Sequence, residues 1–167
     1  VGVAFEMLVT ASLAEKSISR PDELEHVLAA MVVKLSPSEA GAAIDALVTA
    51  IRATSEVRWL EALGEVLAAL GGKVIPPQAE RSADRLVTVM QVTTDSVQLR
   101  ALGKGLVALN LELTRAQADS AVDRLVAAAL SPRGYGTLES VEGVLTALAA
   151  KLAPEQAESA GALLINA

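Results

Sequence analysis

The sequence predicts an all-α protein, an α-α superhelix (solenoid) of stacked antiparallel helix pairs with a 39-residue repeat. Composition gives the first indication: 52% of the residues are hydrophobic but only 2% are aromatic, so the core must consist of Leu, Val and Ala. Leu and Ala are strong helix formers. The second indication is that apolar residues are spaced three and four apart, which keeps them on one face of a helix. The third is that this pattern recurs along the chain.

The recurring pattern is a row of four apolar residues, mostly Leu, that returns every 39 residues without a gap. Its four copies are Leu24, Leu28, Met31 and Leu35; Leu63, Leu67, Leu70 and Val74; Leu102, Leu106, Leu109 and Leu113; and Val141, Leu145, Leu148 and Leu152. A pair of helices in a unit of this length cannot bury such rows alone, so each unit must stack on its neighbours. Each fully buried Leu contributes roughly 1.5–3 kcal/mol relative to an exposed one, so stacking is the expected source of stability.

The repeat describes the whole chain, 1–167, as a single solenoid segment. Residues 1–19 form a partial repeat, 20–58, 59–97 and 98–136 are full repeats, and 137–167 is a nearly complete last repeat. We call the first and second helix of each repeat helix A and helix B. Because the chain starts and stops inside a repeat, we expect it to be a piece of a longer array.

Capping and breaker residues then place the helices in order. Residues 1–16 are the helix B of the partial repeat, and Pro21 opens the next helix A, where the missing N–H would be unpaired anyway. Ser36 and Glu39 form a capping box that opens the following helix B. The later openings, in the order A, B, A, B, A, B, are Thr54-Ser55-Glu56, Pro76-Pro77, Thr94-Asp95, Thr114-Arg115-Ala116-Gln117, Thr137, and Ala153-Pro154-Glu155-Gln156. Short junctions make successive helices antiparallel neighbours.

Small and large apolar residues also keep their repeat positions. Helix B carries one Leu in all five copies: Leu8, Leu47, Leu86, Leu125 and Leu164. Alanine occupies one position of helix A and one of helix B in four copies each: Ala30, Ala69, Ala108 and Ala147, and Ala40, Ala79, Ala118 and Ala157. A solvent-facing position has no reason to be alanine every time beyond helix propensity. We therefore expect helices to approach closely at both alanine positions.

Paired antiparallel helices, about forty residues per unit, proline at the start of helix B and an interior rich in small residues resemble the HEAT/armadillo class of α-solenoid. The resemblance covers the whole chain and is one of architecture. It implies a curved rod whose B helices line the concave face and serve as a scaffold or binding surface.

Composition and charge exclude several classes of function. The formal net charge is −6 and no basic patch is visible, so we expect no nucleic-acid partner. No stretch approaches the roughly 18 apolar residues that a spanning helix needs, so we expect no membrane partner. There are no cysteines, and His26 is the only histidine, so neither a usual zinc site nor a Ser-His-Asp set can be assembled. We expect no enzyme activity, no metal and no cofactor.

A column of acids on helix B is the best candidate binding feature. Asp45, Asp84 and Asp123 share a repeat position, about 160° around the helix from the core Leu. Glu80, Asp119 and Glu158 share the position one turn earlier. With helices stacked about 8–10 Å apart, these carboxylates would form a ladder that could steer a basic peptide or a cation. The alternative is a solvated helix face with acids near helix N-termini, which the helix dipole favours.

Two arginines and one tryptophan complete the candidate site. Arg85 and Arg124 form a partial column beside the acids, which could hold a carboxylate or phosphate. Alternatively, they pair with acids of the neighbouring repeat, worth about 0–1 kcal/mol each. Trp59, at a junction between repeats, would either anchor an interface or cover the end of the core.

The function we expect is a non-enzymatic repeat scaffold that binds a protein or peptide through the helix B face. The alternative is a structural spacer array in a larger multidomain protein whose activity lies elsewhere. Phe5, Leu8 and Leu164 at the two ends should lack a covering repeat, which favours end-to-end self-association. The cytoplasm is the favoured compartment, although the absence of cysteine fits others.

Overall fold

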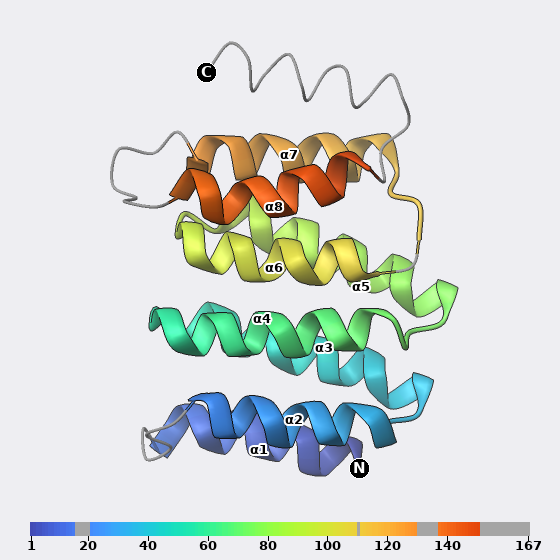
Figure 1. Cartoon of the computed structure of the whole chain (residues 1–167). Helices are drawn as coiled ribbons and strands as arrows, with labels where there is room; N and C mark the ends of the chain where they lie inside the picture. The colour runs from blue at the N-terminus through green and yellow to red at the C-terminus, as the bar shows by residue number, and fades with distance from the viewer. Residues whose placement is uncertain (16–20, 110, 130–136, 151–167) are drawn as a thin grey trace.

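A computed structural model describes residues 1–15, 21–109, 111–129 and 137–150 of the chain, and the regular structure in these ranges is entirely helical (Figure 1). The all-α prediction is therefore confirmed. The helices are α1 (Gly2–Glu15), α2 (Pro21–Lys34), α3 (Pro37–Ala53), α4 (Val57–Gly71), α5 (Pro76–Val92), α6 (Ser96–Ala108), α7 (Arg115–Ala129) and α8 (Thr137–Ala149). The helix expected from Pro154 onward, with Ala157 and Leu164, lies outside the described residues.

The helices lie in two layers, stacked from α1 and α2 at one end to α7 and α8 at the other (Figure 1). Each helix packs against the helix two places further along the chain, so that α2, α4, α6 and α8 form one layer and α1, α3, α5 and α7 the other. We call these the helix-A layer and the helix-B layer. Contacts between α3 and α4, α5 and α6, and α7 and α8 join the two layers.

The core lies between the layers and is aliphatic. Residues that the period equates are buried alike, since Leu24, Leu63 and Leu102 are 3%, 1% and 0% exposed. The helix B leucines Leu47, Leu86 and Leu125 are fully buried. Phe5 is also fully buried, which corrects the expectation that it would be uncovered at the end of the stack. It packs within the core because α1 rests on α3 with this side, whereas Leu8 is only half-buried.

Both predicted capping boxes are confirmed. Ser36 N donates to Glu39 Oε2 at 2.9 Å, and Glu39 N donates to Ser36 Oγ at 3.4 Å. Thr114 N donates to Gln117 Oε1 at 2.9 Å, and Gln117 N donates to Thr114 Oγ1 at 3.3 Å. Asp95 accepts bonds from two backbone amides at the start of α6, both at 2.9 Å. These local bonds satisfy N–H groups that the first helical turn leaves unpaired, so the sequence places these openings correctly.

The two alanine positions behave differently. Ala40, Ala79 and Ala118 in the helix-B layer are fully buried, as expected for close approach. In the helix-A layer the expectation is wrong, because Ala30 and Ala69 are exposed and Ala108 and Ala147 are half-buried.

Glycine makes the close approach between α4 and α6 instead. A Cβ added at Gly64 would lie 3.2 Å from the Cβ of Ala101, and one added at Gly71 would lie 2.7 Å from the carbonyl carbon of Ala108. The spacing of a single position did not reveal this, because each glycine faces a residue 37 places further on. Within the described ranges, no helix is both long and apolar enough to cross a bilayer.

Candidate functional site

The predicted acidic column lies on the exposed side of the helix-B layer. Asp45 is on α3, Glu80 and Asp84 are on α5, and Asp119 and Asp123 are on α7, and all five are exposed. We call this surface the helix-B face. The acids are not equally available, because three of them have neighbours that partly satisfy their charge.

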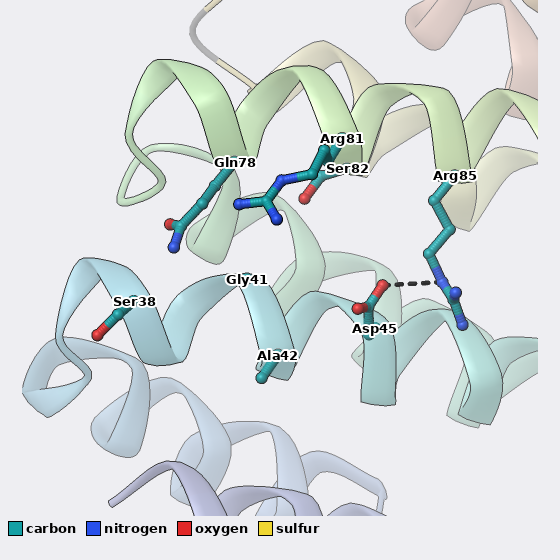
Figure 2. Close-up of a pocket in the computed structure, with 8 residues that line it drawn as sticks. All are labelled: Ser38, Gly41, Ala42, Asp45, Gln78, Arg81, Ser82 and Arg85. Carbon is teal, nitrogen blue, oxygen red and sulfur yellow. Dashed lines mark ion pairs between the residues drawn. The ribbon is translucent and has the colours of Figure 1, made fainter.

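Those three acids are bound in three different ways. Asp45 pairs with Arg85 of the next helix in the layer, with Oδ1 2.8 Å from Nε (Figure 2). Asp84 accepts a hydrogen bond from Gln117 Nε2 at 2.5 Å, and Asp119 lies 3.6 Å from Arg115 on its own helix. Glu80 and Asp123 form no ion pair within the part of the chain that the structure describes. The helix-B face is therefore a mixed-charge surface rather than a uniform ladder.

The two arginines have different roles. Arg85 pairs with an acid of the preceding repeat, which is the neighbour alternative considered above. Arg124 is half-buried and donates from Nε to Met90 O at 3.1 Å and from a terminal nitrogen to Thr93 O at 2.7 Å. Arg124 thus caps the carboxyl end of α5, where positive charge is favoured by the helix dipole.

The reason for this difference lies one period earlier. The carbonyl of Thr54, equivalent to that of Thr93, already accepts a hydrogen bond from Gln98 Nε2 at 2.7 Å. One period after Gln98 the chain has Thr137, a shorter residue type, so the carbonyl of Thr93 needs another donor. Arg124 supplies it.

Trp59 is 7% exposed and belongs to the core cluster, so the structure places it in the core-covering position rather than on an open surface. In the helix-A layer, two ion pairs join α4 to α6, and neither was recognised in the sequence. Arg100 lies 2.7 Å from Glu61, and Lys104 contacts Glu65. Opposite charges exactly one period apart are the signal that would have revealed them.

One repeat position in the helix-B layer links each helix to the one before it. Glu39 accepts a bond from Gly2 N at 2.8 Å, Gln78 packs over Gly41, and Gln117 donates to Asp84. Hydrogen bonds from the backbone of Ser36 and then of Gly2 lower the pKa of Glu39 to about 2, from an ordinary 4.5. This carboxylate therefore joins the cap of α3 to the start of α1.

A groove opens between α3 and α5 on the helix-B face (Figure 2). Its cavity volume is about 420 Å³. It is lined by Ser38, Gly41, Ala42, Asp45, Gln78, Arg81, Ser82 and Arg85, and we call it the α3–α5 groove. Asp45 and Arg85 were predicted site residues; Gln78 and Gly41 were not recognised, because neither residue type signals binding in the sequence.

The groove brings donors and an acceptor together. Arg81 Nε donates to Pro77 O at 3.2 Å, and the end of its side chain extends beside Gln78 and toward α3 (Figure 2). Gln78 Oε1 is buried and has no hydrogen-bond partner. Buried polar atoms are usually paired, so an orphan acceptor in a groove marks a place where a ligand donor would be favourable.

Chemistry at a metal centre has no candidate within the described ranges, since no group of three His, Cys, Asp or Glu residues there could hold an ion. No protein family matches the chain, and no curated protein is similar to it in sequence. The groove and the mixed charges of the helix-B face are therefore the features from which a function can be argued.

Proposed function

We propose that the chain is a non-enzymatic repeat scaffold, a 39-residue α-solenoid of the HEAT/armadillo type, that binds a protein or peptide through the helix-B face. The observation that carries the repeat is the pairing of Arg100 with Glu61 and of Lys104 with Glu65, each 39 residues apart. Such pairs lie side by side only if successive repeats stack in register. A stack of this kind grows by addition and offers an extended surface.

The α3–α5 groove supports the choice of the helix-B face. The helix-A layer is closed between α4 and α6 by glycine contacts and ion pairs, whereas the helix-B layer is hollowed between α3 and α5. Binding surfaces combine a recess with a few polar groups that orient the ligand. The α3–α5 groove has both properties.

A second copy of the chain is the partner we propose for the α1–α2 end of the stack. Val27 is 49% exposed, whereas Val66, one period later, is 1% exposed. Ala4 is exposed, whereas Ala43 is buried. These positions present half of a repeat-to-repeat contact, which another copy can cover.

The experiment is a selection from a random peptide display library on the folded chain, followed by affinity measurements on the enriched peptides. The variant Glu80→Lys/Asp123→Lys reverses two unpaired acids on the helix-B face. The control, Glu112→Lys/Glu142→Lys, changes the net charge equally with exposed acids outside that face. We expect the first variant to change affinity by roughly tenfold, or about 1.4 kcal/mol, and the control to leave it near the wild-type value.

Peptides that respond equally to both variants would contradict binding through the helix-B face. Failure to enrich any peptide would favour the spacer array over the scaffold.

A further inference from the structure

We propose that the α3–α5 groove binds a carboxylate group of an acidic peptide, held by the guanidinium groups of Arg81 and Arg85. The proposal rests on the proposed function, because it assigns the ligand chemistry of the helix-B face. It is opposite in sign to the basic ligand that the acidic column suggests in the sequence.

The groove has room for such a group because Gly41 has no side chain. A Cβ at Gly41 would lie 3.6 Å from Gln78 Cδ, so the floor of the groove beside the amide is open. The cavity of about 420 Å³ is within the range of ligand sites, which are commonly about 300–1,000 Å³. It can take one acidic side chain together with the backbone that carries it.

The two arginines supply more donors than the protein uses. Arg81 uses Nε for Pro77 O, and Arg85 uses Nε for Asp45. No hydrogen bond of the described residues engages their terminal nitrogens, and both side chains reach the groove from α5 (Figure 2). A planar guanidinium offers parallel N–H groups that match the two oxygens of a carboxylate.

Charge within the groove also favours an anion. Its lining contains the cations Arg81 and Arg85 and one anion, Asp45, so one positive charge is left uncompensated. Asp45 is already paired, so a lysine or arginine entering the groove would have to displace Arg85 and would face Arg81. Among the acids of the helix-B face, Glu80 and Asp84 do not line the groove.

Gln78 distinguishes a peptide from a simple anion. Its buried Oε1 lacks a donor, and a carboxylate ion brings none. A peptide brings a backbone N–H beside its acidic side chain, which can satisfy the amide oxygen while the carboxylate binds the arginines. The groove therefore matches an acidic peptide segment better than acetate or phosphate.

The test is a nuclear magnetic resonance titration of the isotope-labelled chain with acetylated, amidated hexaglutamate, and separately with hexalysine, acetate and inorganic phosphate. We expect hexaglutamate to shift the Nε–Hε signals of Arg81 and Arg85 and the side-chain amide of Gln78. Arg81→Gln should weaken this binding by roughly tenfold, as expected for a lost charge-assisted contact. The control Arg52→Gln removes an equal charge from an exposed residue in the last turn of α3, outside the groove, and should change affinity by less than about twofold at moderate salt.

Each other outcome overturns the proposal. Equal loss with Arg81→Gln and Arg52→Gln would show general charge attraction, and equal shifts with acetate or phosphate would show an anion site without peptide recognition. Preferential binding of hexalysine would reverse the ligand chemistry. If library-selected peptides map to the helix-B face while hexaglutamate does not bind, the scaffold stands and the acidic ligand fails. If neither binds there, both fail.

Discussion

The α4–α6 contact and the α3–α5 contact are made by the same period in the two layers, yet they differ in almost every physical respect. In the helix-A layer, Gly64 and Gly71 let α6 approach so closely that a Cβ at either position would crowd a residue of α6. Two ion pairs flank this contact. In the helix-B layer, Gly41 faces the flexible amide of Gln78, and a groove remains between the helices.

The difference shows how one repeat can separate stability from binding. Tight packing of backbone against backbone resists deformation, because protein interiors are close-packed and bear volume changes poorly. Polar side chains across a groove can be rearranged at lower cost. The helix-A layer thus holds the register of the stack, and the helix-B layer keeps an adaptable surface.

Matched glycine substitutions should give the largest contrast between the layers. Gly71→Ala places a Cβ 2.7 Å from the carbonyl carbon of Ala108, and we expect it to lower the free energy of unfolding by about 1–3 kcal/mol. Gly41→Ala meets only an ordinary contact, 3.6 Å from Gln78 Cδ, and should raise it by about 0.5–1 kcal/mol through helix propensity. Urea unfolding followed by circular dichroism measures both. Equal effects of the same sign would abolish the contrast.

Acid should act on the helix-B layer through Glu39. Its pKa is lowered to about 2 in the folded chain, so the unfolded chain binds more protons between the ordinary value of 4.5 and about 2. The contribution of Glu39 to stability is therefore present above pH 4.5 and is lost as the pH falls toward 2. We expect Glu39→Gln to flatten the pH dependence of unfolding in that window. A dependence identical to that of the wild type would contradict the proposed link between α1 and α3.

The exposed end of the stack should associate weakly with a second copy. Light scattering over a concentration range should show a mass that rises for the wild type and stays at the monomer value for Val27→Lys, because a charge cannot be buried there without cost. Val92→Lys is the control, since Val92 is 70% exposed on α5, away from this end. A monomer at every concentration, or the same response from both variants, would exclude this contact.

The smallest expected effect is that of the ion pair across the helix-A layer. A double-mutant cycle with Glu61→Gln and Arg100→Gln should give a coupling energy of about 0.2–1 kcal/mol, as is typical of pairs at a surface. The pair lies beside the glycine contact but is not its cause. A coupling well above this range would make charge, rather than close packing, the main term between α4 and α6.

Sequence reasoning predicted the helices well because their signals are local. Ser36 with Glu39 and Thr114 with Gln117 place two helix starts through bonds within four residues, and the aliphatic rows identify the buried side. It failed at Ala30, because an unchanging residue type does not say which neighbour a position faces. That depends on how far successive helices shift against each other, a property of the packed layers.

The candidate site was predicted less well for the same reason. The exposed acids such as Asp84 and the pairing of Arg85 follow from helix periodicity. The groove depends on the absence of a side chain at Gly41 and on the unpaired amide of Gln78, which only the packing of α3 on α5 reveals. The role of Arg124 likewise depends on a carbonyl 31 residues earlier in the chain.

Disulfide formation tests the stacked register most directly, because the chain has no cysteine of its own. A Cβ at Gly64 lies 3.2 Å from the Cβ of Ala101, close to the roughly 3.5–4.5 Å that disulfides span. We predict that Gly64→Cys/Ala101→Cys oxidises in the folded chain. The control Glu25→Cys/Ala101→Cys, with its first site one period earlier, should stay reduced. A 64–101 pair that stays reduced, or a 25–101 pair that oxidises as readily, would contradict the stacking of successive repeats.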